Sequence, residues 1–364
     1  MPSGSKRSGR VRETPNRRKE AIDAFLTVLT RVQGLEERRL RRVLTDRKAR
    51  VKTHGPAVGA MVSAVAELTL RKGKRLRPAL VALGQRAANG RADLGLAVEV
   101  GAALELLHTY LLIHDDWMDD DAVRRGGPTV HVMLARTFRS ERLGNASAIL
   151  AGDYALSLAT EILTRLRVPD ARLRLLVACF NEMHEHAVLG QELDISGTSD
   201  GPEAAYALKT ASYSVRGPLR LGALLAKARP ATLRALDRYA APIGIAFQLR
   251  DDLLSAFGDP RDTGKPLGGD LRSGKRTPLV LHATRRARGK DRVLLARALG
   301  NPRASDADVR RALDVIARTG AKEAVEARID ALVARGLGAL GPSMTSEGRK
   351  LLTGAALALT ARER

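Results

Sequence analysis

The chain has 364 residues, with 62 Lys and Arg against 40 Asp and Glu for a formal net charge of +22, and 44% of its residues are hydrophobic. These values exclude a disordered or fibrous protein and fit a globular one. Only 3% of the residues are aromatic, so Leu, Val and Ala must build the core. The single cysteine, Cys179, excludes an internal disulfide and fits a reducing cytoplasm.

The excess positive charge is concentrated near the N-terminus. Residues 1–54 hold 16 Lys and Arg against 6 Asp and Glu, and residues 1–20 have almost no apolar side chain. We therefore predict a disordered basic tail over residues 1–20 and one domain over residues 21–364. Neither a continuous apolar run of about 18 residues nor the apolar stretch of a secretory signal is present, so we expect no integral membrane segment and a cytoplasmic location.

Helical spacing of apolar residues dominates the chain beyond the tail. Val58, Met61, Val62 and Val65 fall at i, i+3, i+4 and i+7 of one helical stripe. Breaks rich in Gly and Pro separate further segments of this kind, at residues 96–120, 145–166, 171–195, 202–227, 231–258 and 275–288. The alternating pattern of strands is missing. The sequence predicts an all-α, single-domain bundle of about ten core helices.

The most informative segment is a Leu-rich helix that ends in five aspartates. Asp115 and Asp119 are four residues apart on one helical face, with Asp116 beside them, so several carboxylates converge. Aspartates at a helix C-terminus oppose the helix dipole, which argues against a merely solvated end. Mg²⁺ binds one or two carboxylates together with substrate phosphate oxygens, and Arg124 and Arg125 follow with charge suited to phosphate. We predict a joint metal and phosphate site.

A second segment has the same organisation. Asp251 and Asp252 close another apolar helix, and the loop that follows carries Lys265 and Lys275. Upstream, the sequence RKGKRLRP places Lys74, Arg75 and Arg77 in a compact cationic turn. Two Asp pairs, each followed by Lys or Arg, predict two carboxylate clusters that face each other and hold a diphosphate through metal ions.

Together these motifs resemble the trans-isoprenyl diphosphate synthases, which join isopentenyl diphosphate head to tail to an allylic diphosphate. DDxxD matches Asp115, Asp116 and Asp119, and FQxxDD matches residues 247–252. The remaining matches, in chain order, are GKRLRP at 73, RRG at 124, AILAGD at 148, GQxxD at 190, KT at 209 and GKRTPLV at 274. The resemblance implies core helices around a central cavity, usually in a homodimer.

The resemblance also assigns roles to individual residues. Isopentenyl diphosphate would be held by Lys74, Arg77, His108 and Arg125. The allylic diphosphate or its departing charge would contact Arg124, Lys209, Thr210, Gln248, Lys265 and Lys275. Gln191 and Asp194 would also bind substrate. Asp115, Asp119 and Asp251 would bind Mg²⁺, three ions shared with the diphosphate, and Asp116 and Asp252 would support them. Where many members have a second DDxxD, this chain has Ser255, but the first Asp usually carries the metal.

Product length depends on the depth to which the growing chain can reach. In the resembling family a large aromatic residue five positions before the first Asp, with a smaller residue at four, accompanies short products. Tyr110 and Leu111 hold these positions. We therefore predict geranylgeranyl diphosphate as the product, with farnesyl diphosphate as the alternative.

Two other classes of function compete with this interpretation. A class I terpene cyclase also uses DDxxD, and Asp252, Ser255 and Asp259 fall at the spacing of its second motif. A cyclase has no use for GKRLRP or His108, which would hold isopentenyl diphosphate. A basic nucleic-acid-binding protein would explain the charge of +22 but not two aspartate clusters at the ends of apolar helices. We expect no nucleic-acid partner.

Overall fold

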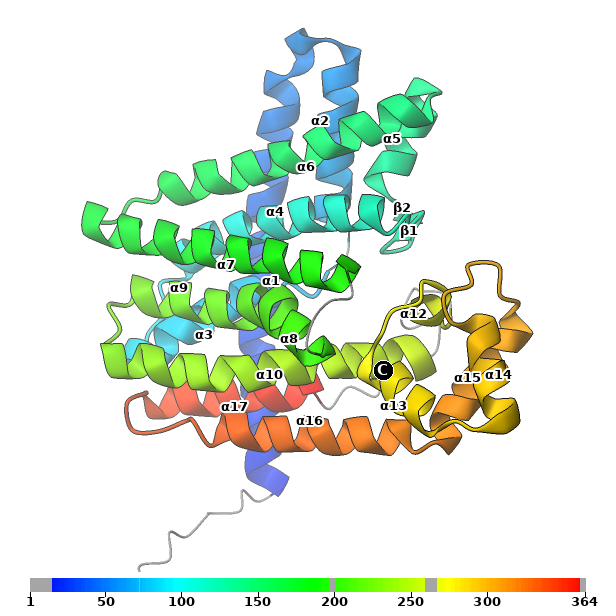
Figure 1. Cartoon of the computed structure of the whole chain (residues 1–364). Coiled ribbons are helices and arrows are strands. Elements are labelled where there is room, and N and C mark those ends of the chain that lie inside the picture. Colours follow the sequence, from blue (N-terminus) through cyan, green and yellow to red (C-terminus); the bar gives the residue numbers. More distant parts are fainter. Residues whose placement is uncertain (1–14, 72, 197–200, 259–266, 361–364) are drawn as a thin grey trace, which may run out of the picture.

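The computed structural model describes residues 15–71, 73–196, 201–258 and 267–360, and helices make up most of this part of the chain (Figure 1). The N-terminal half contains α1 (Pro15–Arg50), η1 (Lys52–His54), α2 (Pro56–Leu70), α3 (Leu76–Asn89), α4 (Leu94–Met118), α5 (Val130–Phe138), α6 (Glu141–Thr164) and α7 (Asp170–Ser196). The C-terminal half contains α8 (Pro202–Tyr206), η2 (Ala207–Arg216), α9 (Gly217–Leu225), α10 (Pro230–Phe257), α12 (Gly269–Arg272), α13 (Pro278–Arg286), α14 (Gly289–Ala298), α15 (Asp306–Arg318), α16 (Ala321–Leu337) and α17 (Ser346–Thr360). The two short strands, β1 (Val123–Arg124) and β2 (Gly127–Pro128), form an antiparallel hairpin. The predicted all-α fold is confirmed.

The first helix begins earlier than the sequence pattern indicates. Helix α1 starts at Pro15, so residues 15–20 of the predicted tail are helical, while residues 1–14 lie outside the described part. Proline is favoured in the first turn, and the Arg and Lys residues that follow it have high helix propensity. An apolar face is therefore not needed for this extension. Farther along α1, Phe25 and Val32 are buried, so the helix is part of the core.

Most of the long helices run roughly side by side in Figure 1, and α1 crosses behind them. By length and composition alone, α4 and α6 would each suffice to span a membrane. However, 67% of the most apolar stretch of α4 and 44% of that of α6 are buried inside the protein. Helix α4 in particular packs as a core helix: Leu104, Leu106 and Leu107 are fully buried.

Helices α3 and α9 approach each other closely because each contributes a glycine. A Cβ atom added at Gly222 would lie 1.9 Å from the backbone oxygen of Val81, and one at Gly84 would lie 2.2 Å from that of Leu219. Both atoms that would clash belong to the backbone of the facing helix, so they cannot move aside. This contact fixes α9 and, through it, the adjoining π-helix η2 that carries Lys209 and Thr210.

We expect Gly222→Ala to lower the free energy of unfolding by about 2 kcal/mol or more, because the added methyl group forces α3 and α9 apart. Gly59→Ala is the matched control: it also lies within a helix, and its added Cβ would meet nothing within 4 Å. The control should gain up to about 1 kcal/mol from helix propensity. Urea unfolding followed by circular dichroism measures both changes, and equal midpoints in the two variants would contradict this account of the packing.

Candidate active site

The first carboxylate cluster is built by the end of α4 and the hairpin that follows. The amide of Asp119 bonds the Asp115 carbonyl, which ends the helix, and Asp120 then adopts a positive φ of 54°. In the hairpin, Arg125 and Gly126 have φ values of 52° and 74°, as the two central residues of a tight type I′ turn require. The chain therefore reverses sharply, and Arg124 lies beside the aspartates of α4.

Arg124 binds the carboxylates of this cluster. Its guanidinium contacts one oxygen of Asp116 through two nitrogens, lies 3.0 Å from Asp121 and lies 3.7 Å from Asp115. Asp116 is fully buried, and burial raises the pKa of its carboxyl to about 6 despite the opposing effect of Arg124. Its second oxygen, Oδ2, is buried without a hydrogen-bond partner among the described residues. The sequence prediction did not include Asp121.

The second cluster lies at the end of α10 and rests on a chain of hydrogen bonds. The Thr210 hydroxyl donates to Gln248 Oε1 at 2.8 Å, and Gln248 Nε2 donates to Asp252 at 3.0 Å. The Tyr206 hydroxyl donates to the other oxygen of Asp252 at 2.5 Å. Asp251 precedes Asp252 on the same helix. No motif in the sequence indicated Tyr206.

A π-helix brings Lys209 and Thr210 to this position. Residues 207–216 form π-helix η2 where the sequence pattern predicts an ordinary helix over 202–227. π-helical turns are rare and occur often at functional sites. Gly190 on α7 faces this segment, since a Cβ atom there would lie 2.3 Å from the amide nitrogen of Lys209. The glycine of the GQxxD motif therefore allows α7 to approach η2.

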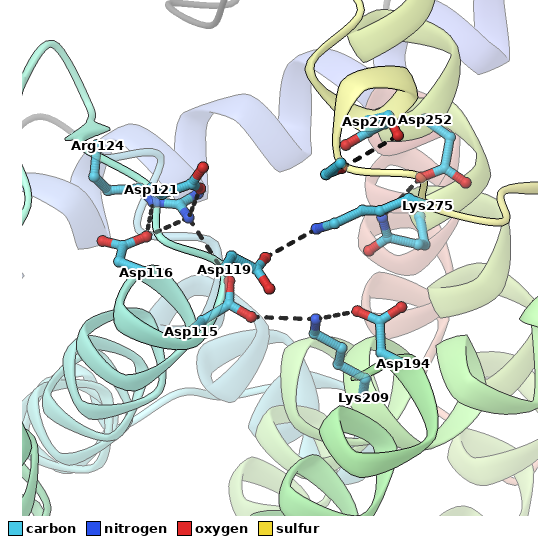
Figure 2. A network of polar contacts seen from close by, with 12 residues as sticks. Asp115, Asp116, Asp119, Asp121, Arg124, Asp194, Lys209, Asp252, Asp270 and Lys275 are labelled. Carbon is cyan, nitrogen blue, oxygen red and sulfur yellow. Dashed lines mark hydrogen bonds and ion pairs between the residues drawn. The ribbon is translucent and has the colours of Figure 1, made fainter. Parts of the chain in front are cut away.

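Two lysines pair with the aspartates of the first cluster (Figure 2). Lys209 lies 3.3 Å from Asp115 and 2.5 Å from Asp194, and Lys275 lies 3.1 Å from Asp119. Burial opposes the charge of Lys209, but Asp115 and Asp194 outweigh it and raise its pKa. Burial likewise favours a neutral Asp115, yet Lys209, Lys275 and Arg124 hold the pKa of its carboxyl below the usual range. Both partners of the Lys209–Asp115 pair are therefore charged at neutral pH.

A separate cationic group is formed by residues of α3, α4 and the hairpin. Arg77 donates to Ser214 at 3.0 Å and lies over the Tyr213 ring at 4.6 Å. Arg125 lies 3.2 Å from Nε2 of His108. Burial, and then Arg77 and Arg125, hold the pKa of His108 well below its usual value, so this imidazole is neutral.

The structure brings Arg77, His108 and Arg125 together as the sequence predicted, and Gly73, next to Lys74, packs against the Arg125 guanidinium. Arg75 differs from the expected cationic turn: its guanidinium is buried and bonds Glu105 at 2.6 Å. Gln191 has a buried Nε2 atom without a partner in the described part of the chain. Lys265 falls within residues 259–266, which lie outside the described residues.

Tyr110 and Leu111 lie on α4 near the first cluster. The Tyr110 ring meets the rings of His114 and His184 edge-on, with centroid distances of 4.7 and 5.2 Å. The His114 ring in turn occupies the space where Gly152 lacks a side chain, 2.2 Å from the position of a Cβ atom. The Gly of the AILAGD motif thus makes room for His114, and α4, α6 and α7 together fix the ring of Tyr110.

The donor set of the two clusters suits Mg²⁺. Within the part of the chain that the structure describes, no three His, Cys, Asp or Glu side chains are grouped closely enough to hold an ion by themselves. Mg²⁺ characteristically takes only one or two carboxylates and completes its octahedron with water and substrate phosphates. Carboxylates at the ends of α4 and α10 agree with this preference, and the neighbouring cations Arg124, Lys209 and Lys275 suit a diphosphate.

We expect a pH-dependent stability from Asp252. Burial raises the pKa of its carboxyl to about 7, whereas an unfolded Asp titrates near ~3.9. Between these values the folded protein holds a proton that the unfolded chain releases, so stability falls as the pH rises through this window. In EDTA, Asp252→Asn should raise the free energy of unfolding above pH 7, by up to about 4 kcal/mol, and should have little effect near pH 4.

The exposed Asp314, changed to Asn, is the control for the loss of one carboxylate. Denaturant unfolding at both pH values provides the measurement. A gain for Asp252→Asn that is the same at pH 4 and pH 8 would show that Asp252 is not the titrating group.

Comparison with known proteins gives consistent matches. A family profile described as "Polyprenyl synthetase" matches residues 60–316. A geranylfarnesyl diphosphate synthase of Aeropyrum pernix is 35% identical over 291 residues, covering 77% of this chain and 87% of that protein. A farnesyl diphosphate synthase of Escherichia coli is 39% identical, covering 61% of this chain and 75% of its own.

Among solved structures, a geranylgeranyl pyrophosphate synthase from Corynebacterium glutamicum, complexed with isoprenyl diphosphate and magnesium, superposes with a TM-score of 0.85. It is 34% identical, and the match covers 92% of this chain and 99% of that one.

Proposed function

The chain belongs to the polyprenyl synthetase family, and from this premise we propose that it condenses isopentenyl diphosphate with an allylic diphosphate to give geranylgeranyl diphosphate. The resemblance to the trans-isoprenyl diphosphate synthases predicted from the aspartate motifs is thereby confirmed. The observation that carries the proposal is the pair of facing carboxylate clusters, at the ends of α4 and α10, with Lys209 and Lys275 between them. A terpene cyclase would not need the second cationic group around Arg77.

The first proposed step is ionisation of the allylic carbon–oxygen bond. The leaving diphosphate gains negative charge, and Arg124, Lys209 and Lys275 offer fixed positive charge around it. Asp115, Asp119 and Asp251 would hold Mg²⁺, which supplies Lewis-acid stabilisation of the diphosphate when bound. Three ions per site remain our proposal for the metal count. Asp116, which contacts Arg124, and Asp252, which contacts Gln248, would support the metal-binding aspartates without binding the metal directly.

The second step is attack on the allylic cation by the double bond of isopentenyl diphosphate. Arg77, Arg125 and Lys74 would hold the diphosphate of this second substrate, and neutral His108 would add a hydrogen bond without repelling the arginines. The carbonyl of Gln248, oriented by Thr210, offers a dipole that can steady the cation without adding to it. The final proton passes to the released diphosphate, so the chain needs no base of its own.

We also propose that the protein is a homodimer. Large apolar side chains are exposed on the outer faces of two adjacent helices: Ile149 and Leu150 on α6 are 38% and 59% exposed, and Val188 and Leu189 on α7 are 45% and 49% exposed. Contiguous exposed apolar side chains are typical of subunit interfaces. The same two helices fix Tyr110, so association would also rigidify that region.

Asp115→Ala should lower kcat by about a thousandfold or more with the fold intact, because it removes a metal ligand and the partner of Lys209. Asp314→Ala on α15 removes an exposed carboxylate and serves as the control. Steady-state turnover with Mg²⁺ and labelled isopentenyl diphosphate measures the effect, and circular dichroism checks the fold. If Asp115→Ala keeps the rate of the wild type, the first cluster does not take part in ionisation.

Substitutions in the two cationic groups, around His108 and around Lys275, should affect the KM values of different substrates. His108→Ala should raise KM for isopentenyl diphosphate by about tenfold and leave KM for the allylic substrate nearly unchanged, because His108 contacts Arg125 and lies apart from Lys209 and Lys275. Lys275→Ala should show the reverse preference. Initial rates with each substrate varied in turn provide the test, and equal effects on both KM values would reject the division of the site.

Product length should depend on Tyr110. Tyr110→Ala removes the ring held between His114 and His184, and the growing chain then gains apolar burial at about 25 cal/mol per Å². We expect the product to lengthen by one or more isoprene units, measured by chromatography of the dephosphorylated alcohols. Phe138→Ala removes a partly buried aromatic ring from α5 as a control. An unchanged product in Tyr110→Ala would show that this ring is not the stop, and a wild-type product of farnesyl diphosphate would favour the alternative.

A further inference from the structure

A concave site outside the aspartate clusters shares none of their residues. It has a volume of about 650 Å³ and opens between the second half of α1, the start of α4 and the end of α6. From α1 it takes Arg39, Arg42, Val43, Asp46, Arg47 and Arg50. These positions follow one another at intervals of three and one residues, so they form a single face of the helix.

The charges of this site do not balance. Six arginines line it against three acidic residues, for a net charge of three positive units. Each acid is already paired: Glu99 with Arg39 at 2.7 Å, Asp46 with Arg50 at 2.9 Å, and Glu161 with both Arg47 and Arg165 at 2.8 Å. Arg42 and Arg167 have no ion pair with a described residue.

Like charges gathered in a concave surface repel one another and raise the local potential, so they concentrate anions. Arginine in particular matches phosphate, because its planar guanidinium can donate two parallel hydrogen bonds to phosphate oxygens. Among the described residues, Nε of Arg47 is buried without a hydrogen-bond partner. A scattered, solvated arginine surface would show neither the concavity nor this buried donor.

The floor of the site is aliphatic. Val43, Ile162 and Leu166 are 7%, 8% and 7% exposed, and Leu96 is partly buried beside them. An inorganic anion would use only the arginines, whereas a ligand with both a phosphate and a hydrocarbon part would use the arginines and the floor.

We propose that this concavity, the arginine cleft, binds an amphipathic phosphate ester, with its phosphate on Arg42, Arg47 and Arg167 and its hydrocarbon part on the aliphatic floor. Such a ligand is either a free prenyl phosphate or the headgroup region of an anionic phospholipid. The site is independent of the aspartate clusters, so the inference stands apart from the proposed reaction.

The first experiment is equilibrium dialysis of labelled farnesyl monophosphate with the full-length protein in EDTA, where binding that depends on Mg²⁺ is suppressed. It compares the wild type with the double variant Arg42→Ser/Arg167→Ser. The control is Arg234→Ser/Arg238→Ser, which removes two exposed arginines of α10 outside the cleft. We expect at least a tenfold loss of affinity in the cleft variant alone.

Inorganic phosphate, measured in competition, tests the role of the floor. If the floor binds the chain, farnesyl monophosphate should bind the wild type at least tenfold more tightly than inorganic phosphate does. Equal affinities would overturn the amphipathic ligand.

A second experiment distinguishes the sources. If the wild type sediments with phosphatidylglycerol vesicles but not with phosphatidylcholine vesicles, and only the cleft variant fails to do so, the ligand is the headgroup region of an anionic phospholipid. If the cleft variant loses affinity for farnesyl monophosphate in dialysis, and the wild type does not bind vesicles, the ligand is a free prenyl phosphate. Identical behaviour of the cleft variant and the α10 control in both assays would overturn the proposal, and circular dichroism verifies that both variants fold.

Discussion

Repulsion between carboxylates at the ends of α4 and α10 is the constraint on which the rest of the site depends. Helix dipoles add to this repulsion, because both clusters stand at C-terminal ends. Lys209 and Lys275 reach across to Asp115 and Asp119, and Arg124 folds back through the hairpin. The elements that carry these cations, a π-helix, the segment after α12 and a tight turn, are all irregular. These irregular segments bring the cations to the aspartates, and the cations offset the repulsion between the carboxylates.

The same arrangement underlies our proposal that one site binds two highly charged substrates. Lys209 pairs with Asp115 and Lys275 pairs with Asp119, so cations of the chain itself offset part of the negative charge of the first cluster. We propose that an incoming diphosphate takes over Lys209 and Lys275, which leaves Asp115 and Asp119 available for Mg²⁺. In this proposal the neutral His108, with Arg77 and Arg125, holds the second diphosphate, so the two diphosphates do not compete.

The residue types in the motifs were enough to predict some of the neighbouring side chains in the site. Lys209 contacts Asp115, and Thr210 contacts Gln248, which bonds Asp252, so motif residues far apart in the sequence come together in the fold. Tyr206 was missed because a tyrosine three residues before a lysine carries no signal in the sequence, and only the fold shows that the end of α8 places it beside Asp252. Arg75 looked like its neighbours in GKRLRP, and only the fold shows that it pairs with buried Glu105. The sequence placed a surplus of positive charge in residues 1–54, and the fold shows that part of it lines the arginine cleft along α1.

The central claim is that metal and diphosphate take the place of Lys209 and Lys275 between the clusters. A crystal structure of the wild-type protein with Mg²⁺ and a non-hydrolysable allylic diphosphate analogue tests it most directly. The account predicts ions bound to Asp115, Asp119 and Asp251, with both lysine ammonium groups moved onto diphosphate oxygens. Lysines that still pair with Asp115 and Asp119, with the diphosphate bound elsewhere, would contradict it.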